Sequence, residues 1–491
     1  MNPSTPVIDA SQEHEVRVQK VNELRSYGIE PWPASRPVSA TCQQVISEYQ
    51  QKPGAEYTVA GRLMTIRKHG KTVFAHLQDR SGRLQIYLKK DLLGDQAFDI
   101  FDKDIDIGDI AWCKGTSFIT KTGEITLQVT EFVLLSKCLY PLPEKFHGIA
   151  DQETKYRQRY LDLITDLQTR DRFIQRSEII KELRAYLDKN DFLEVETPML
   201  HPIAGGAAAR PFVTHHNALH MDLYLRIAPE LYLKRLVIGG LERVYEINRN
   251  FRNEGISTRH NPEFTMLEFY MAYQDYQFIM GFIEKMLQEA ALKACDTLQL
   301  PFGDHIIDFA QPFQRMSAYQ ALLKYGGLSE KELAPEQIDA TSKTYQVNTA
   351  HMSHNQKIFA LFEELAEKQL IQPTFIVDYP LELSPLAKKD PKNPQLAARY
   401  ELFIAGMEIS NGYNELNDPF DQAQRFQEQV KVHTGGNEEA HRYDADYIHA
   451  LEYGLPPSVG VGIGIDRLVM LLTNTPSIKE VILFPTLKEV K

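Results

Sequence analysis

The sequence predicts an α+β protein with two main domains: a small β-barrel, followed by a larger domain in which an antiparallel β-sheet is flanked by helices. Two observations predict it. Residues 57–135 contain five short β-like runs separated by glycine-bearing turns, whereas the chain beyond residue 157 alternates long helical segments with extended, glycine-punctuated ones. At 491 residues the chain also exceeds what one hydrophobic core usually serves.

Composition narrows the class of protein. With 43% apolar and 24% charged residues, the chain is typical of globular proteins. Its four cysteines show neither a CxxC pair nor ligand-like histidine spacing, which argues against a zinc site or a disulfide framework. No signal-like segment or apolar run of about 20 residues is present, so we expect a cytoplasmic protein that does not contact membranes.

The net charge of -12 is unfavourable for a protein that binds RNA by charge alone. Contact with RNA depends on local positive patches rather than on net charge, however. One such patch precedes the second β-like run and consists of Arg62, Arg67, Lys68, His69 and Lys71.

The five β-like runs suggest a closed barrel of the oligonucleotide-binding (OB) type; they cover residues 58–66, 72–78, 83–89, 109–119 and 124–135. Alternation directs Val73, Ala75 and Leu77 inward and leaves Phe74 and Gln85 on the outer face. Exposed aromatic residues beside basic groups can stack on bases, although an exposed Phe alone is more often an edge-packing residue.

Changes in pattern suggest the domain boundaries. We expect a helical N-terminal extension (1–56), the barrel (57–140), a linker (141–156) and the large domain (157–491), with a helical insertion at about 325–372. The large domain should open with a long amphipathic helix from Arg172 to Asn190.

The most specific pattern begins at residue 243, where two extended runs surround a polar loop and predict a β-hairpin. Period-two alternation places one set of side chains on a common surface: Asn248, Asn250, Arg252, Phe264, Met266, Glu268 and Tyr270. This surface offers a cation, aromatic rings and a carboxylate together. Taken alone, a salt-bridged surface hairpin is an equally good interpretation.

Phe251-Arg252-Asn253-Glu254, with His260 and Phe264 downstream, resembles motif 2 of class II aminoacyl-tRNA synthetases. The resemblance implies that Arg252 holds the α-phosphate and carboxylate of the adenylate. It also implies that Glu254 accepts a hydrogen bond from the adenine amino group, that His260 lies near the terminal phosphates and that Phe264 stacks on adenine.

Two further segments complete the resemblance. The segment that starts at Gly460, GVGIGIDRLVMLL, resembles motif 3. This resemblance implies that Arg467 binds the γ-phosphate. A glycine-rich strand packed on a helix would explain the glycines but not this arginine, because a cation in the first helical turn gains nothing from the helix dipole. The helix at 172–190 with the following Phe192–Pro198 resembles motif 1, which implies a homodimer.

Charge discriminates among the amino acids that such enzymes activate. Alternation places Asn411, Tyr413 and Glu415 on one face, and the hairpin supplies Glu268 and Tyr270. Two carboxylates and an aromatic wall suit a long aliphatic chain that ends in ammonium, as in L-lysine. Because a buried carboxylate is costly without a cation, we expect Glu268 and Glu415 to lie unsatisfied until the ligand binds.

The chain is therefore most similar to the bacterial-type lysyl-tRNA synthetases of subclass IIb. This resemblance implies that Gly206 and Glu230 hold the α-amino group of lysine and that Asn411 helps with its carboxylate. Tyr413 and Asn414 depart from the Phe and Ser expected there, but Tyr413 keeps the aromatic wall.

The same resemblance implies a cofactor and an RNA partner. Glu401 and Glu408, which flank the bend at Ala405-Gly406, match carboxylates that bind Mg²⁺ together with ATP, although any such pair is more often simply solvated. The barrel residues that match anticodon-contacting positions are Arg67, Phe74, Gln85 and Glu124. The implied activity is activation of L-lysine with ATP to lysyl-adenylate and transfer of lysine to the 3′ end of tRNA(Lys).

Two alternatives belong to other functional classes. A paralogue that passes lysine to a protein would lack the barrel, whereas this chain has one. A catalytically inactive RNA-binding or regulatory protein would not require the intact set of Arg252, Glu254, Phe264 and Arg467. Pyrophosphate exchange tested with each amino acid separates these cases.

Overall fold

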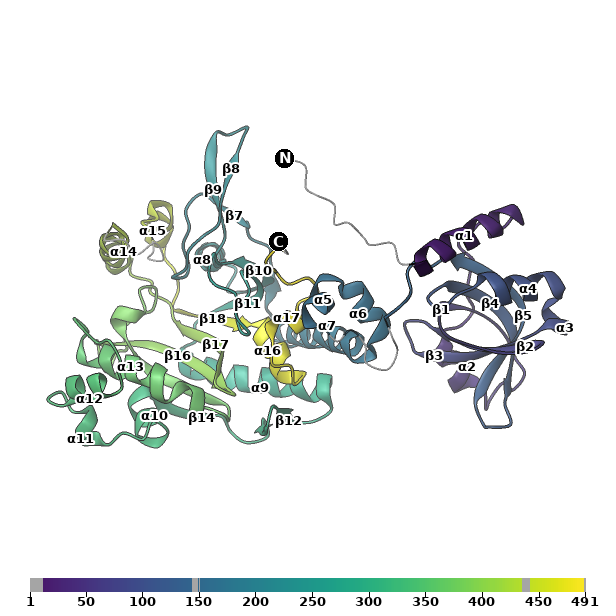
Figure 1. Cartoon of the computed structure of the whole chain (residues 1–491). Helices are drawn as coiled ribbons and strands as arrows, with labels where there is room; N and C mark the ends of the chain where they lie inside the picture. The colour runs from purple at the N-terminus through teal and green to yellow at the C-terminus, as the bar shows by residue number, and fades with distance from the viewer. Residues whose placement is uncertain (1–11, 144–148, 150, 435–441, 490–491) are drawn as a thin grey trace. The chain divides into compact units, whose positions relative to one another are not determined.

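The computed structural model describes residues 12–143, 149, 151–434 and 442–489, and the chain divides into two compact units, Met1–Ala150 and Asp151–Lys491 (Figure 1). The expected linker at 141–156 lies partly outside the described residues, and helix α5 (Gln152–Arg157) begins within its described part. Of the expected N-terminal extension, residues 1–11 are likewise outside the described part.

The N-terminal unit is a closed five-stranded barrel with the strand order β1-β2-β3-β5-β4. All five predicted strands are present, as β1 (Glu56–His69), β2 (Thr72–Gln78), β3 (Arg83–Lys89), β4 (Ile110–Ile119) and β5 (Ile125–Ser136). Val73, Ala75 and Leu77 are buried as alternation predicts. Four helices accompany the barrel: α1 (Gln12–Ser26), α2 (Cys42–Glu48), α3 (Lys90–Leu93) and α4 (Asp95–Asp104). Leu24 of α1 and Val45 of α2 join the barrel core, so the expected extension packs on the barrel.

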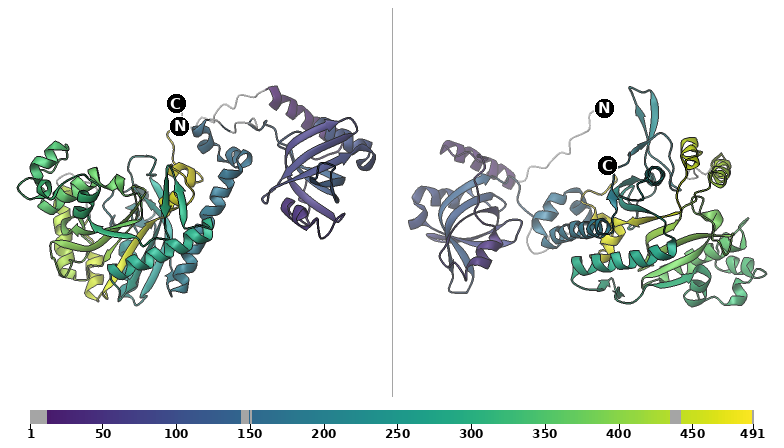
Figure 2. Two further views of the ribbon diagram at one scale, coloured as in Figure 1. Left: turned by 90° about the horizontal axis from the view of Figure 1, so that it is seen from below. Right: turned by 180° about the vertical axis from the view of Figure 1, so that it is seen from behind.

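The C-terminal unit is built on an eight-stranded sheet with the order β14-β15-β16-β17-β18-β11-β10-β6 (Figure 2). Its strands are β6 (Leu193–Glu194), β10 (Arg243–Phe251), β11 (Glu263–Ala272), β14 (Gln314–Ser317), β15 (Thr374–Pro380), β16 (Leu396–Ile404), β17 (Met407–Asn414) and β18 (Ser458–Gly464). The five inner pairs are antiparallel, as expected, but the outermost pairs β14–β15 and β10–β6 are parallel. Two small sheets accompany it, formed by β7 (Leu200–His201), β8 (Val213–His216) and β9 (Met221–Leu225), and by β12 (Gln299–Phe302) and β13 (His305–Asp308).

One face of the large sheet is covered by helices. Leu267, Phe269 and Met271 of β11 belong to the same core as side chains of α7 (Leu167–Lys189), α9 (Tyr276–Cys295) and α16 (Ile465–Leu472). Alternation turns Met266, Glu268 and Tyr270 to the opposite face, which we call the pocket face. Helix α7 begins five residues before the expected Arg172 because Asp166 caps it by accepting from the Gln168 amide.

The remaining helices lie around this sheet: α6 (Arg159–Thr165), α8 (Glu230–Ile238), α10 (Ala318–Lys324), α11 (Glu330–Leu333), α12 (Ile338–Thr344), α13 (His354–Leu365), α14 (Pro419–Thr434), α15 (Ala445–Glu452) and α17 (Ile478–Val481), with 3₁₀ turns at Glu367–Gln369 and Leu381–Leu383. Helices α11, α12 and α13 fall in the span of the expected insertion and share a core with α10 and with side chains of β15 and β16.

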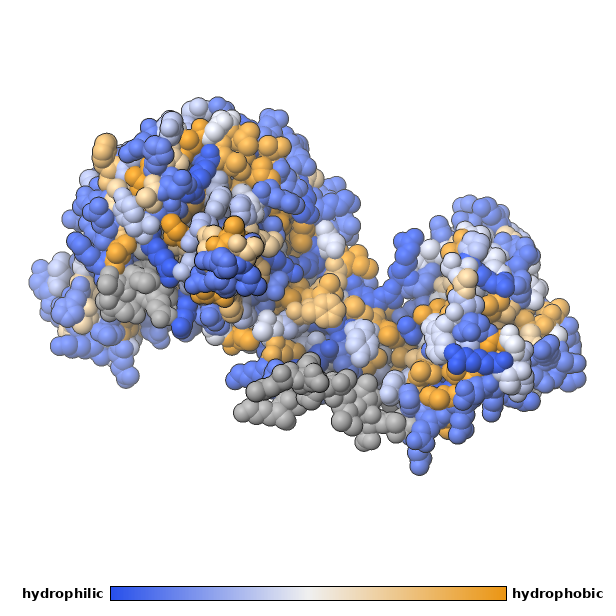
Figure 3. Space-filling view, turned by 90° about the horizontal axis from the view of Figure 1, so that it is seen from above, coloured by the Kyte–Doolittle hydropathy of each residue, from blue (hydrophilic) through white to orange (hydrophobic). Residues whose placement is uncertain are grey.

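The surface seen in Figure 3 is mostly hydrophilic, with scattered hydrophobic patches on both units. Among the described residues, no helix combines the length and the apolar composition that crossing a membrane requires.

Candidate active site

The predicted hairpin forms, and its register places the expected side chains on one face. Strand β10 pairs with β11 so that Asn250 lies opposite Phe264, Asn248 opposite Met266 and Glu246 opposite Glu268. Arg252 follows directly after β10, where its amide donates to the carbonyl of Pro262 at 2.8 Å. The loop from 252 to 262 therefore starts and ends on the pocket face.

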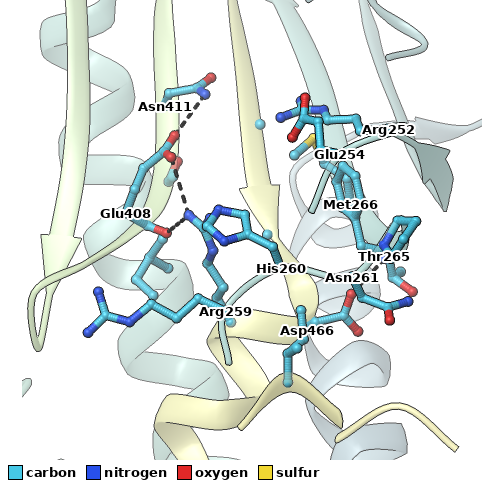
Figure 4. Close-up of a pocket in the computed structure, with 18 of the residues that line it drawn as sticks. Arg252, Glu254, Arg259, His260, Asn261, Thr265, Met266, Glu408, Asn411 and Asp466 are labelled. Carbon is cyan, nitrogen blue, oxygen red and sulfur yellow. Dashed lines mark hydrogen bonds and ion pairs between the residues drawn. The ribbon is translucent and has the colours of Figure 1, made fainter. Parts of the chain in front are cut away.

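Two adjoining cavities open on this face. We call the first the arginine pocket; it has a volume of about 100 Å³ and its lining includes Arg252, Glu254, Arg259, His260, Phe264, Glu408, Asn411 and Arg467. In Figure 4, Glu408 and Asn411 form one wall and Arg252 and Glu254 the opposite one. The second, which we call the carboxylate pocket, has a volume of about 390 Å³ and its lining includes Gly206, Glu230, Glu268, Tyr270, Asn411 and Tyr413. Arg252, Met266, Asn411 and Gly462 line both cavities.

Arg252 lies between the two cavities with incomplete bonding. Its guanidinium lies over the Phe264 ring at 5.1 Å from the centroid, and its buried Nε has no hydrogen-bond partner within the described part of the chain. Burial lowers the pKa of Arg252, while the charge of Glu254 opposes this effect. A cation with an unsatisfied buried donor is suited to receive an anionic ligand.

The structure brings Arg467, Glu408 and His260 together, although they are far apart in sequence. Arg467 Nη1 donates to the Glu408 carbonyl at 2.9 Å and lies 3.3 Å from its carboxylate, and Nη2 lies 3.0 Å from His260 Nε2. Burial lowers the pKa of His260 and Arg467 lowers it further, which favours the neutral imidazole. This corner thus presents one fixed cation next to a neutral donor or acceptor.

A β-bulge places Glu408 and Asn411 on the same face. The register of β16 and β17 shifts at Ile409, so two residues that are three apart both point into the arginine pocket, and the Asn411 amide donates to Glu408 at 3.1 Å. Ala405 and Gly406 form the bend between the strands, with φ values of +52° and +64°. Both residues therefore adopt the left-handed conformation that a tight hairpin turn requires.

Glu401 and Glu408 approach each other across this hairpin. Glu401 forms an ion pair with Arg399, and Glu408 pairs with Arg467. Burial raises the pKa of Glu401; Arg399 opposes the change and the neighbouring Glu408 reinforces it. The two carboxylates are therefore close enough to repel each other.

In the carboxylate pocket, Glu268 is the residue that satisfies the sequence-based expectation. It is 5% exposed and accepts from the Tyr270 hydroxyl at 3.2 Å, and it forms no ion pair with any described residue. Burial raises the pKa of Glu268 to about 8, and the charge of Glu230 adds to the shift. A cation entering this pocket would relieve that cost.

For Glu415, the expectation of a missing cation is wrong, because its carboxylate, 1% exposed, forms an ion pair with the fully buried Lys234. Neither of its two carboxylate oxygens has a hydrogen-bond partner among the described residues. The same ammonium lies 2.5 Å from Glu230, which also accepts from the Tyr413 hydroxyl at 2.8 Å. Burial opposes the charge of Lys234, but the two carboxylates outweigh it and raise the pKa of Lys234.

Two glycines shape the carboxylate pocket, Gly206 and Gly460, and Gly460 does so for a different reason than expected. A Cβ at Gly460 would overlap the Glu415 carboxylate and the Tyr270 ring, so this glycine makes room for pocket side chains rather than only for a ligand. Gly206 has φ +90°, and a Cβ there would lie 3.3 Å from that of Glu230. Gly206 and Glu230 therefore lie side by side.

The four barrel residues singled out from the sequence form two neighbouring pairs. Arg67 pairs with Phe74 across β1 and β2, and Gln85 donates to Glu124 at 2.6 Å. Phe74 packs on Tyr87 with ring centroids 4.8 Å apart. Gln85 is more buried than alternation predicted, because Glu124 and Thr126 both bond to its amide.

Three charged residues that organise the site were missed from the sequence: Lys234, Arg399 and Asp466. Lys234 follows Glu230 by four residues and Arg399 precedes Glu401 by two, and these spacings are the only signals that could have found them. Asp466 accepts from the Thr265 amide at 2.7 Å and pairs with Arg176 of α7 at 2.7 Å.

Comparison with known proteins shows the family of the chain. The family model described as tRNA synthetases class II (D, K and N) matches residues 151–488, and the OB-fold nucleic acid binding domain matches residues 57–135. A lysine–tRNA ligase of Carboxydothermus hydrogenoformans is 52% identical over 475 residues, 96% of this chain and 97% of that protein. Those of Syntrophomonas wolfei (50% identical, 98% of each chain) and Nitrosomonas europaea (56% identical, 88% and 86%) are similarly close. The chain therefore belongs, with these lysine–tRNA ligases, to the class II tRNA synthetases of the D, K and N family.

Proposed function

We propose that this chain is a lysine–tRNA ligase that activates L-lysine with ATP to lysyl-adenylate and pyrophosphate, and then transfers lysine to the 3′ end of tRNA(Lys). The observation that carries the proposal is that Arg252 lines both an arginine-rich cavity and a carboxylate-rich one. The first suits a polyphosphate and the second suits an ammonium group. A bond between the two ligands would form where the cavities meet.

In the arginine pocket we assign ATP. Arg252 would neutralise the α-phosphate and the lysine carboxylate, Arg467 the γ-phosphate, and His260 would lie near the terminal phosphates. Glu254 would accept from the adenine amino group while Phe264 stacks on the ring. The 5.1 Å contact between Arg252 and Phe264 supports this arrangement, since a base on Phe264 would bring its phosphate towards the guanidinium.

In the carboxylate pocket we assign lysine. Glu268 with Tyr270 offers a buried acceptor for an ammonium, Gly206 and Glu230 would hold the α-amino group, and Asn411 would help with the carboxylate. Tyr413 supplies an aromatic wall for the aliphatic chain. Glu415 would contribute through its ion pair with Lys234.

Glu401 and Glu408 fit Mg²⁺. They offer hard oxygen ligands that repel each other, and no cluster of three acidic, histidine or cysteine side chains that could hold a metal occurs among the described residues. Mg²⁺ in nucleotide sites is commonly held by one or two carboxylates plus substrate phosphates, so this sparse set is appropriate. When bound, the ion would neutralise phosphate charge.

No general base is required for activation. The lysine carboxylate is already ionised at neutral pH, so its oxygen can attack the α-phosphorus in line while pyrophosphate leaves. Arg252 and Arg467 would stabilise the negative charge that develops. A terminal hydroxyl of the tRNA, the 3′ one by class analogy, would then attack the lysyl carbonyl and release AMP.

The barrel is assigned to the anticodon, with Arg67, Phe74, Gln85 and Glu124 as its contacts. We further propose a homodimer through α7 and β6, because Ile174 and Leu193 are apolar yet 56% and 51% exposed. The cytoplasm is the compartment we assign, since tRNA charging supplies translation there.

Pyrophosphate exchange tests the proposal. Only lysine among the amino acids should support rapid ATP–pyrophosphate exchange, and purified tRNA(Lys) should then be charged. Exchange with another amino acid, or none with lysine, would contradict it.

A further inference from the structure

Lys234 carries an ammonium group that does not line the carboxylate pocket but contacts Glu230, which does. It lies one helical turn after Glu230 in α8, with no exposed surface. Its Nζ lies 2.5 Å from Glu230 and forms an ion pair with Glu415, so it bridges a helix and the end of strand β17. The rings of Tyr413 and Tyr447 lie 5.7 and 6.0 Å from it.

Burial of this ammonium costs free energy, which raises the question of what it contributes to the protein. A buried ion pair often contributes less to stability than apolar side chains of the same volume, so burial of Lys234 is weak support for a purely stabilising part. Its two partners differ: Glu230 lines the cavity, whereas Glu415 lies behind Gly460 and Tyr270. Lys234 therefore connects a carboxylate that a ligand can reach to one that is fully buried.

The charges around the cavity also balance in an informative way. Two charged lining residues do not enter this balance, because Arg399 pairs with Glu401 and Glu382 is exposed. Of the buried groups, Glu230, Glu268 and Glu415 are three carboxylates, and Lys234 neutralises one of them. The fully ionised set then has two negative charges in excess. L-lysine brings two ammonium groups, while its carboxylate would face Arg252.

We propose that Lys234 is a positioning residue for the amino acid. It fixes the excess negative charge of the pocket at the value that a diamino acid requires, and it holds Glu230 in the orientation that receives the substrate. The inference rests on the proposed lysine-activating function and assigns a further specificity-determining residue to it. Lys234 acts through Glu230 and Glu415.

Chemical rescue tests the proposal directly. Lys234→Ala deletes three methylene groups and the ammonium, which together correspond to n-propylammonium. In lysine-dependent pyrophosphate exchange we expect the KM for lysine to rise about 30-fold or more, with the KM for ATP within about two-fold of wild type. Adding propylammonium should recover about 10-fold of this loss, and the neutral isostere 1-propanol should recover none.

Two further variants separate charge from folding. Lys234→Met fills the space without charge and should show the raised KM for lysine but no rescue. Arg159→Ala breaks the equally buried Arg159–Asp162 pair, in which each side chain is 1% exposed and neither lines a cavity. It should lower the melting temperature while leaving the KM for lysine unchanged and insensitive to propylammonium.

The outcomes are distinct. A wild-type protein that does not exchange with lysine would overturn the proposed function and this inference with it. With lysine-dependent exchange intact, a wild-type KM for lysine in Lys234→Met would overturn the inference alone. So would a parallel rise of the KM values for lysine and ATP, since that pattern indicates a general structural role. If Lys234→Ala does not fold, the KM values of Lys234→Met decide.

Discussion

The two cavities that meet at Arg252 differ in how their charged side chains are exposed to solvent and paired. In the arginine pocket, charged side chains lie on a loop and beside a hairpin bend, are partly exposed, and leave a buried donor of Arg252 without a partner. In the carboxylate pocket, Glu230 and Glu415 are buried and share an internal cation, Lys234. A partly exposed cation can be solvated until its ligand arrives, whereas an ionised carboxylate that is buried is costly without a counter-ion.

Glu268 is the exception, because its carboxylate has no ion-pair partner within the described part of the chain and can bind the ammonium of a ligand. It is buried like Glu230 and Glu415 but forms no ion pair with any described residue, and its pKa is raised mainly by burial. The comparison therefore predicts that Arg252 dominates catalysis and that Glu268 dominates the affinity for lysine.

The largest expected effect is that of Arg252→Ala. Removing the cation shared by both cavities should lower the rate of lysine-dependent pyrophosphate exchange about 10³-fold, as for loss of a transition-state donor. The melting temperature should change little, since Arg252 Nε satisfies no described partner. Exchange near the wild-type rate would show that the two cavities do not meet at a reacting centre.

Glu268→Gln should raise the KM for lysine about 30- to 1,000-fold, which corresponds to the ~2–4 kcal/mol of a buried charge pair left incomplete. The KM for ATP should stay within about two-fold. Glu263→Gln on the same strand is the matched control, because its carboxylate is 50% exposed. If both variants keep wild-type affinity, the ammonium of lysine binds elsewhere in the pocket.

The pKa of Glu268 predicts a pH dependence. Its pKa in the folded protein, about 8, lies above the ordinary value of 4.5, so protonation of Glu268 stabilises the folded protein in the absence of lysine. This stabilisation is complete below about pH 4.5. This contribution is lost as the pH rises towards 8. Lysine requires the ionised form, so its affinity should rise up to about tenfold per pH unit from pH 6 to 8 and then level off.

Titration calorimetry in buffers of different ionisation enthalpy checks this directly. Lysine binding at pH 7 should release a proton from the wild-type protein, and Glu268→Gln should release none at concentrations that saturate it. A wild-type affinity that is flat across this range would mean that Glu268 is already ionised in the free protein.

The barrel should affect neither cavity. Phe74→Ala removes a stacking surface worth roughly 1–3 kcal/mol, so charging of tRNA(Lys) should fall about five- to 150-fold while pyrophosphate exchange stays normal. Gln85→Ala should have a milder effect. Transcripts with altered anticodons sharpen the test, because Phe74→Ala should compress the preference for the native anticodon. Unchanged preference would place the RNA on another barrel face.

The smallest expected effect concerns Asn414, whose side chain accepts from the amide of Tyr276 at the start of α9 at 2.8 Å. Asn414→Ser should cost about 0.5–1.5 kcal/mol of stability in denaturant unfolding. The KM for lysine should not change, because Asn414 does not line the carboxylate pocket. A shift in lysine affinity would instead link α9 to substrate binding.

Regular periodicity explains what the sequence could predict. The barrel strands, the hairpin and the shared face of Phe264, Met266 and Glu268 all follow from period-two alternation, and the structure has each of them. The bulge at Ile409 breaks that period, so the meeting of Glu408 and Asn411 could not be derived from spacing.

The pairing of Lys234 was hidden for a different reason. A Glu and a Lys four residues apart in a helix are usually a surface pair, and only burial turns them into part of a pocket. The partner Glu415 is nearly two hundred positions away in the chain, and no local pattern connects it to Lys234. Long-range electrostatic partners of this kind depend on the folded sheet, as do the parallel pairs at its edges.

Asp466 links residues on both sides of the arginine pocket, so the effects of substitutions on the two sides depend on each other. Its carboxylate binds the Thr265 amide, next to Phe264, and Arg176 of helix α7, and it directly precedes Arg467. The residues proposed to hold the two ends of ATP are thus anchored to a single acidic side chain and, through it, to the helix proposed to contact a second subunit. A substitution at Phe264 would therefore alter the position of Arg467, and the reverse, so the energetic effects of the two substitutions are not additive.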